Sequence, residues 1–160
     1  MNPQQKIKVG GILDFRDLCL IGVMSAPDKP GLVASIFQTL GEERLNAQFI
    51  VQSIDLNNES HVQFCVAMED MERTLASLAP VAKTLEAQKI TRTPSVAILS
   101  VFGPDFRERP GIAGVAFDAL ARAGVNILAV STSISTVSSV IKDRDFDNAM
   151  DALHHAFAFP

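Results

Sequence analysis

The sequence is poor in several residue types, and each shortage excludes a class of protein. It contains no tryptophan and no tyrosine, so ten phenylalanines supply its aromatic side chains. The formal net charge is −4, and no lysine or arginine cluster offers the basic surface that a nucleic-acid partner needs. No apolar run reaches the ~18 residues expected of a membrane span. The first residues, MNPQQK, also lack the apolar stretch of a signal peptide.

Cysteine is scarce as well. The two cysteines, Cys19 and Cys65, both fall in strand-like segments. That placement is typical of small buried hydrophobic side chains in a reducing compartment. Together with the lack of a signal peptide, it predicts a cytoplasmic protein.

Catalytic and metal-binding motifs are missing too. The sequence has no glycine-rich phosphate loop and no serine nucleophile elbow. His154 and His155 are neighbours, which point in different directions on a helix. Asp143, Asp145 and Asp147 lack the glycine and the glutamate that would complete a calcium loop. We therefore predict no catalytic residue, no metal site and no cofactor.

The sequence does contain an internal repeat, whose two copies lie eighty residues apart. Pro30-Gly31 returns as Pro110-Gly111, and Asn46 returns as Asn126. The same spacing relates Phe37 to Phe117, Leu40 to Leu120, and Ser53-Ile54 to Ser133-Ile134. A repeat in so short a chain predicts two small copies of one fold.

Hydrophobic periodicity predicts the same order of elements in both copies. In the first copy we expect a strand over 18–24, a helix over 30–43, strands over 47–56 and 62–66, and a helix from Asp70 that is interrupted near Pro80. In the second copy we expect strands over 96–102, 126–133 and 137–141, and helices over 111–123 and 146–157. The polar stretch 82–93 reads as a linker between the copies.

This order predicts an α+β fold of two ferredoxin-like βαββαβ units in tandem, each with helices on one face of an antiparallel sheet. The first domain is expected over residues 16–90 and the second over 94–160. Residues 7–14 form a lead-in strand that can add to the sheet of the second domain. Gly10-Gly11 within it permits a bend or bulge.

The Pro-Gly turns are the strongest candidates for a binding site. Each begins a helix, where free N–H groups attract an anion such as a carboxylate. Beside each turn an acidic side chain, Asp28 or Glu108, can take an ammonium group. The two features together suit the zwitterionic end of an amino acid, and Gln52 and Asn126 can complete the pocket. The alternative is ordinary turn chemistry, in which the aspartate caps the helix.

Both copies resemble the tandem ACT domains of aspartate kinases. The first does so over 21–54 and the second over 95–135, followed by the ending ALHHAFAFP. The motifs in register are the DKPG turn, Val51-Gln52, the GVNI of 124–127, the STS of 131–133 and Leu153-His154. The similarity extends over roughly residues 9–159.

The resemblance implies a regulatory role. In that family the tandem is an allosteric region that forms dimers through its ACT sheets and binds lysine or threonine at the interfaces. It implies a non-catalytic module for feedback inhibition in aspartate-family amino-acid biosynthesis. The implied partners are an amino-acid effector, a second copy of the chain in a homodimer, and a separate kinase catalytic subunit. The catalytic domain that precedes the tandem in the family is absent from this sequence. The effector contacts of the family fall on Asp28, Gly31, Val33, Gln52, Asn126 and Ile127.

The sequence departs from the family pattern in three places. Gly103-Pro104-Asp105-Phe106 stands where a G-x-G-M segment is usual, and His61-Val62 replaces a threonine-aspartate pair. Ile134 and Thr136 stand where glutamate and arginine are expected, which bears above all on lysine recognition. The altered hairpin and Ile134 favour a second interpretation, a structural dimerisation or docking module with a decayed ligand site.

Overall fold

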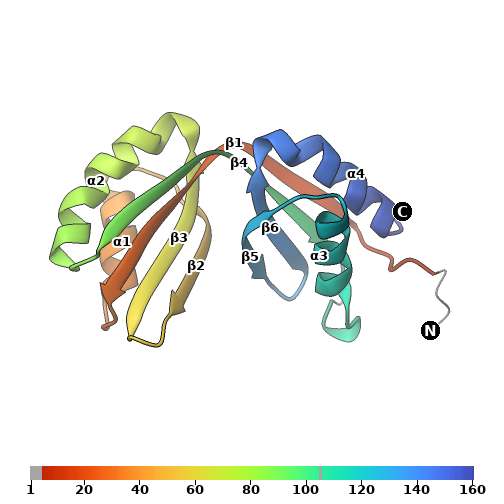
Figure 1. Ribbon diagram of the computed structural model, residues 1–160, viewed down its shortest axis with the longest axis horizontal. Helices are drawn as coiled ribbons and strands as arrows, with labels where there is room; N and C mark the ends of the chain where they lie inside the picture. The colour runs from red at the N-terminus through yellow and green to blue at the C-terminus, as the bar shows by residue number, and fades with distance from the viewer. Residues whose placement is uncertain (1–4, 105) are drawn as a thin grey trace. The chain divides into compact units, whose positions relative to one another are not determined.

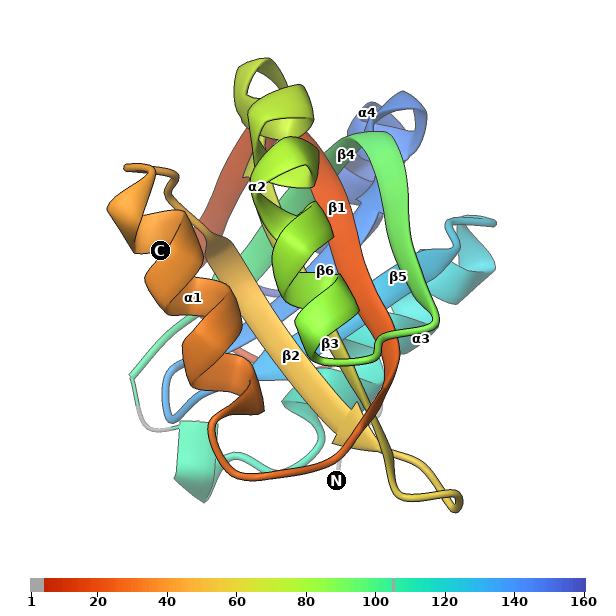
Figure 2. The same ribbon diagram turned by 90° about the vertical axis from the view of Figure 1, so that its left-hand side faces the viewer.

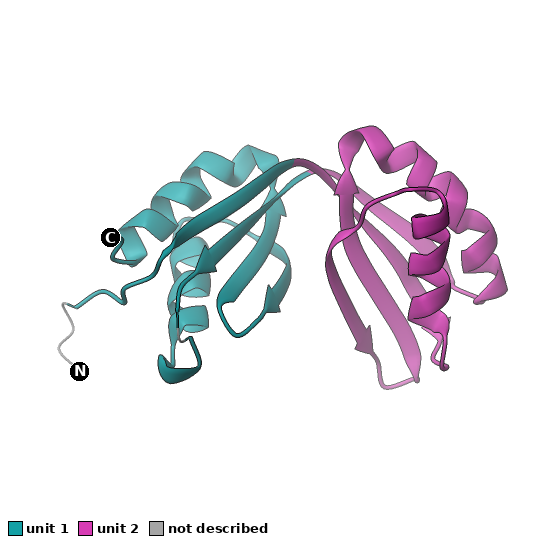
Figure 3. Ribbon diagram, turned by 180° about the vertical axis from the view of Figure 1, so that it is seen from behind, with its two compact units in different colours: residues 1–16, 96–160 teal, residues 17–95 magenta. Residues whose placement is uncertain are grey.

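The computed structural model describes residues 5–104 and 106–160, so Asp105 of the Gly103–Phe106 segment lies outside the described residues. The chain divides into two compact units (Figure 3). Unit 2 is Asp17–Ser95, and unit 1 combines the chain up to Arg16 with Val96–Pro160. The two units are described separately below.

Unit 2 contains the elements of the first copy (Figure 1). They are most of β1 (Gly11–Pro27), α1 (Leu32–Glu42), β2 (Gln48–Ile54), β3 (Glu59–Ala67), the short η1 (Met68–Asp70), α2 (Met71–Thr84) and the first part of β4 (Lys89–Phe102). β3 pairs antiparallel with both β1 and β2. Figure 2 shows α1 and α2 on one face of these strands.

Unit 1 repeats this arrangement. Its elements are the first residues of β1, the rest of β4, η2 (Phe106–Glu108), α3 (Ile112–Arg122), β5 (Ile127–Thr132), β6 (Thr136–Lys142), η3 (Asp143–Asp145) and α4 (Phe146–Ala156). β6 pairs antiparallel with β4 and β5, and the strand order is β2-β3-β1-β4-β6-β5. The α+β class with repeated ferredoxin-like units is thereby confirmed. No helix in the described part of the chain is long and apolar enough to cross a membrane.

Each unit has a core built from the helix faces that the periodicity predicts. In unit 2, Leu32, Ile36 and Leu40 of α1 are buried, and Phe37 packs edge-on against Phe64 with ring centroids 5.2 Å apart. In unit 1 the corresponding residues of α3 are Ile112, Ala116 and Leu120. The repeat at i, i+4 and i+8 therefore places one stripe of each helix on its sheet.

Three local expectations are wrong. β1 is one strand of 17 residues, so the lead-in and first strands are continuous. The strand passes from unit 1 to unit 2 after Arg16, with Asp17 in left-handed backbone at φ 56°. The linker expected over 82–93 is mostly regular, because α2 extends to Thr84 and β4 begins at Lys89. Pro80 does not interrupt α2, whose buried Leu78 and Ala82 hold both sides of it against the unit.

Gly10 and Gly11 are explained by close packing. A Cβ atom on Gly11 would lie 2.8 Å from the Phe102 ring, and one on Gly10 would lie 2.9 Å from it. Real Cβ atoms do not approach so closely, so the aromatic ring of β4 requires glycine at both positions. Neither residue has a positive φ.

Candidate binding site at the Pro-Gly turns

The first Pro-Gly turn joins the end of β1 to the start of α1. Gly31 precedes the helix with φ 89°, and a Cβ atom built on it would meet nothing within 4 Å. Glycine is favoured there by the left-handed backbone and not by lack of space. The amide of Leu32 donates to the Lys29 carbonyl at 3.3 Å, which closes the turn.

The N-terminus of α1 is open. No side chain caps it, and its first turn contains no acidic residue. The helical ladder begins with the Ser35 amide, which donates to the Gly31 carbonyl at 2.9 Å. Among the described residues, none accepts a hydrogen bond from the amides of Val33 and Ala34. These two N–H groups and the helix dipole favour an anion at this point.

Asp28 lies in the same turn and is half-buried. Its amide donates to the Asn58 carbonyl at 3.0 Å, which ties the turn to the β2–β3 hairpin. Its carboxylate makes no hydrogen bond or ion pair with any residue that the structure describes. Asp28 therefore does not cap α1, and its charge is available to an ammonium group.

Gln52 and Val33 are the other two predicted residues of unit 2. Gln52 is exposed on β2 beside Val62, and its Nε2 donates to the buried Ser60 hydroxyl at 2.8 Å. That bond orients the amide of Gln52 within the strand. Val33 contributes its side chain to the core of unit 2, so only its backbone amide can face a ligand.

Asn126 and Ile127 belong to unit 1. Asn126 is exposed just before β5, and Ile127 is half-buried against the core of that unit. The six predicted residues thus divide into four of unit 2 and two of unit 1, and their assembly into one pocket stays a prediction.

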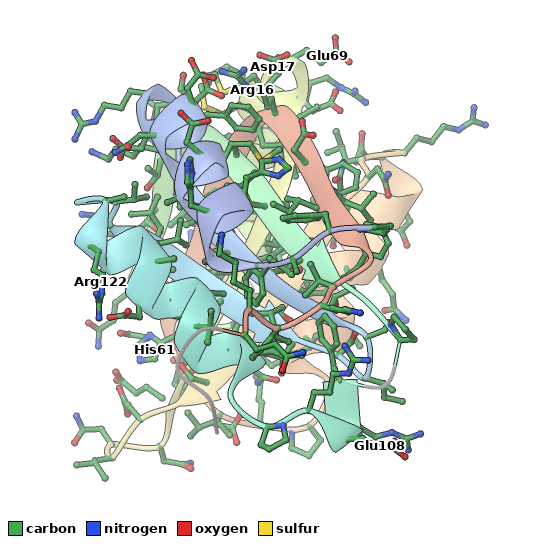
Figure 4. The ribbon with its side chains drawn as sticks, turned by 90° about the vertical axis from the view of Figure 1, so that its right-hand side faces the viewer. Arg16, Asp17, His61, Glu69, Glu108 and Arg122 are labelled. Carbon is green, nitrogen blue, oxygen red and sulfur yellow. The ribbon has the colours of Figure 1, made fainter. Side chains whose placement is uncertain are left out.

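The second Pro-Gly turn adds a pocket that the sequence reasoning missed. Gly111 has φ 96°, α3 has no side-chain cap, and a pocket of about 240 Å³ opens beside this turn. Its polar lining includes Arg107, Arg109, Thr132 and Ser133. Glu108 does not line it, and Figure 4 shows this side chain on the outside of the short helix η2. The second turn therefore presents arginines, which suit a carboxylate.

His61 is less exposed than its place in the alternating strand β3 suggests. The strand alternation indicates a surface residue, but only 21% of its side chain is exposed. The Ser25 amide donates to its Nδ1 at 3.1 Å, and its Nε2 lies 2.9 Å from Oδ2 of Asp55. Because Nδ1 accepts a hydrogen bond, the proton of the neutral ring is assigned to Nε2. The hydrogen bond from His61 lowers the pKa of Asp55, and the amide of Glu59 adds to this effect.

The two cysteines and the histidines of α4 are the other chemically reactive side chains. Cys19 and Cys65 are buried and unpaired, and burial raises the pKa of Cys65 to about 12. Within residues 5–104 and 106–160 no three histidine, cysteine or acidic residues are grouped to hold a metal ion. His155 bonds through Nδ1 to the Asp151 carbonyl at 2.7 Å on its own helix.

The chain is similar in sequence and structure to several known proteins. Residues 99–157 match the ACT domain family. The aspartokinase of Bacillus sp. (strain MGA3) is 30% identical over 154 residues, which are 96% of this chain and 38% of that protein. The aspartokinase of Mycolicibacterium smegmatis is 28% identical over 157 residues, 97% of this chain and 37% of that protein. The chain thus spans less than two fifths of these curated relatives.

Solved structures that contain aspartate-kinase subunits match more than nine tenths of this chain. The regulatory subunit of aspartate kinase from Thermus thermophilus, in its ligand-free form, has a TM-score of 0.85 at 28% identity. The match covers 94% of this chain and 99% of that one. A structure of aspartokinase alpha and beta subunits matches with a TM-score of 0.84 at 29% identity, covering 92% of this chain and 97% of that one.

Proposed function

This chain is an ACT-domain protein of the aspartate-kinase regulatory type, and on that premise we propose that it binds an amino-acid effector at the Pro-Gly turn of unit 2. The binding would make it a non-catalytic allosteric module that conveys feedback inhibition to an aspartate kinase. An effector can do this only by binding unequally to two arrangements of the protein.

One observation carries the proposal. The turn holds the amides of Val33 and Ala34 and the carboxylate of Asp28, none of which has a partner among the described residues. The amides suit the carboxylate of a free amino acid, and Asp28 suits its ammonium group. Gln52, held by Ser60, supports the proposal because its side-chain oxygen is left to accept from the same ammonium group.

The proposed effector is of the threonine or lysine type. A lysine ligand would need an acidic partner for its second ammonium group, and Ile134 and Thr136 stand where the family carries glutamate and arginine. This favours threonine, whose short hydroxyl-bearing side chain needs no such partner. The arginine-lined pocket of unit 1 is a second candidate position for the carboxylate of an effector.

We also propose two protein partners. A separate kinase catalytic subunit is suggested by the solved structure of aspartokinase alpha and beta subunits that this chain resembles. A second copy of the chain is suggested by β2, which ends the strand order and exposes Ile50 by 49% and Ile54 by 53%. An unpaired strand edge with apolar side chains is stabilised by pairing. The same surface favours the alternative function, a structural dimerisation or docking module without a working ligand site.

A thermal-shift screen of the purified chain against the twenty amino acids tests the proposal. A ligand at a hundred times its dissociation constant adds about 2.7 kcal/mol to the stability of the folded state, so Tm should rise by several degrees. Asp28→Ala should abolish the rise, whereas Glu69→Ala, which removes an exposed charge from the same unit, should retain it. Cooperative melting that no amino acid shifts would support the structural module instead.

A further inference from the structure

Three groups form a hydrogen-bonded chain beside the proposed effector turn. The Ser25 amide donates to Nδ1 of His61, and Nε2 of His61 donates to Oδ2 of Asp55. Ser25 lies on β1, Asp55 follows β2, and His61 is on β3. The imidazole ring therefore joins three strands of unit 2 at the end where β1 enters the turn.

The Ser25 amide depends on this ring. Ser25 has left-handed backbone at φ 55°, where the pairing of β1 with β3 shifts register between Val23 and Ala26. The strand ladder consequently offers its amide no carbonyl, and His61 is its acceptor. Without that acceptor, a partly buried N–H would stand unpaired three residues before Asp28.

The hairpin beyond His61 holds the turn from the other side. Asp55 accepts hydrogen bonds from the amides of Asn57 at 2.8 Å and Glu59 at 3.1 Å, which shapes the loop. The Asn58 amide donates to the Asp55 carbonyl at 3.1 Å, and the Asn58 carbonyl accepts from the Asp28 amide at 3.0 Å. The conformation of Asp28 is thus tied to the same hairpin that His61 connects to β1.

We propose that His61 is a positioning residue for the effector site, and that its neutral form holds the Asp28 turn in the binding conformation. The inference rests on the proposed function. Nδ1 can accept the Ser25 N–H only while it carries no proton. Protonation of Nδ1 makes it a donor that faces the Ser25 N–H donor, so the hydrogen bond between them is lost. The turn then becomes less ordered. Effector binding should therefore weaken as the pH falls.

The charged groups on the surrounding elements are carboxylates and lysines. Asp55 and Glu59 lie on the hairpin, Asp28 and Lys29 lie in the turn, and Lys89 begins β4. Of these, Asp55 contacts the ring, and the Nε2 of Gln88 bonds Glu59 at 3.1 Å. Imidazole is the side chain that ordinarily changes charge between pH 5 and 8.

Two substitutions at His61 separate its two hydrogen bonds. His61→Asn keeps a carbonyl oxygen on Cγ, where Nδ1 stands, so it retains an acceptor for Ser25 and cannot titrate. His61→Gln places an amide nitrogen near the position of Nε2, so it retains a donor to Asp55 and loses the acceptor. The double variant His154→Asn/His155→Asn removes the other two histidines of the chain and serves as the control.

The experiment measures two quantities at pH 8.0 and pH 5.5 in the wild type and these variants. The first is the hydrogen-exchange protection factor of the Ser25 and Asp28 amides in the ligand-free protein. The second is the dissociation constant of threonine and of lysine, by calorimetry. Loss of one hydrogen bond should weaken binding about three- to tenfold at the lower pH in the wild type and in the control.

The expected results differ between the two variants. In His61→Asn, the dissociation constants and the amide protection factors should be the same at both pH values. They should equal those of the wild type at pH 8.0. His61→Gln should resemble the wild type at pH 5.5 throughout. The inference would be overturned if effector affinity still depended on pH in His61→Asn. It would also be overturned if the amide protection factors of the wild type did not change with pH. If neither amino acid binds the wild type, the proposed function fails, and the amide protection alone decides whether His61 holds the turn.

Discussion

The guanidinium group of Arg16 binds the carboxylate of Asp143 through two parallel hydrogen bonds, with Nε 2.8 Å from Oδ1 and Nη2 2.9 Å from Oδ2. The same guanidinium lies over the Phe146 ring, 4.0 Å from its centroid. Within unit 1 this arrangement attaches β1 to the start of α4 (Figure 4). The hydrogen bond from Arg16 lowers the pKa of Asp143.

The Arg16–Asp143 pair should stabilise the fold in a pH-dependent way. Asp143→Asn is expected to reduce the free energy of unfolding by about 1 kcal/mol at pH 7, because the pair is partly exposed and screened. A lowered pKa in the folded state means that this contribution is present above about pH 4 and is lost as the pH falls through the lowered value. In urea titrations, the difference in the free energy of unfolding between Asp143→Asn and the wild type should be smaller at pH 3 than at pH 7. Asp147→Asn, in the first turn of the following helix α4, is the control, and an equal loss there would contradict the assignment.

Gly11 should not tolerate a side chain. Gly11→Ala places a Cβ atom 2.8 Å from the Phe102 ring, and overpacking of this kind costs about 1–3 kcal/mol. Gly41→Ala in α1 is the matched comparison, since a Cβ there meets nothing within 4 Å and alanine favours a helix by up to about 1 kcal/mol. Thermal unfolding of both variants should move Tm in opposite directions. A Gly11→Ala protein as stable as wild type would refute the packing explanation.

Gly31 should be sensitive to backbone conformation alone. Gly31→Ala forces a Cβ-bearing residue to φ 89°, which costs about 1–2 kcal/mol although no atom lies within 4 Å. Gly31→Asn should cost less, because asparagine adopts left-handed backbone more readily. Chemical unfolding of the two variants measures the difference. Equal losses for alanine and asparagine would point to a steric cause in place of a conformational one.

The two cysteines should react only when unit 2 opens. Both are buried, and burial raises the pKa of Cys65 to about 12, so almost no thiolate is present near neutrality. Alkylation by iodoacetamide at pH 8, followed by mass spectrometry, should be slow in buffer and fast in urea. The urea dependence of labelling should follow the unfolding transition monitored by circular dichroism. Rapid labelling of the folded chain would show that these strands open locally.

The proposed site was readable from sequence only in part. The Pro-Gly turns, their helices and the acidic residue beside the first turn follow from local patterns, because turn and helix-start chemistry depends on neighbouring residues. Only the structure shows that Asp28 does not cap α1, since a side chain next to a helix can turn toward it or away. Likewise, the role proposed for Arg107 and Arg109 follows from the pocket that they share with Thr132, the last residue of β5, and Ser133.

The sequence by itself determined the duplication, the fold class and the buried helix faces, since an eighty-residue repeat and a stripe such as Leu32, Ile36 and Leu40 are properties of spacing along the chain. Tertiary structure decided what depends on distant segments. The ring of Phe102 explains Gly10-Gly11, and the bulge at Ser25 turns His61 from an apparent surface residue into a bridge between strands. Such contacts join residues that are 36 or more positions apart, and no local pattern records which of them will meet.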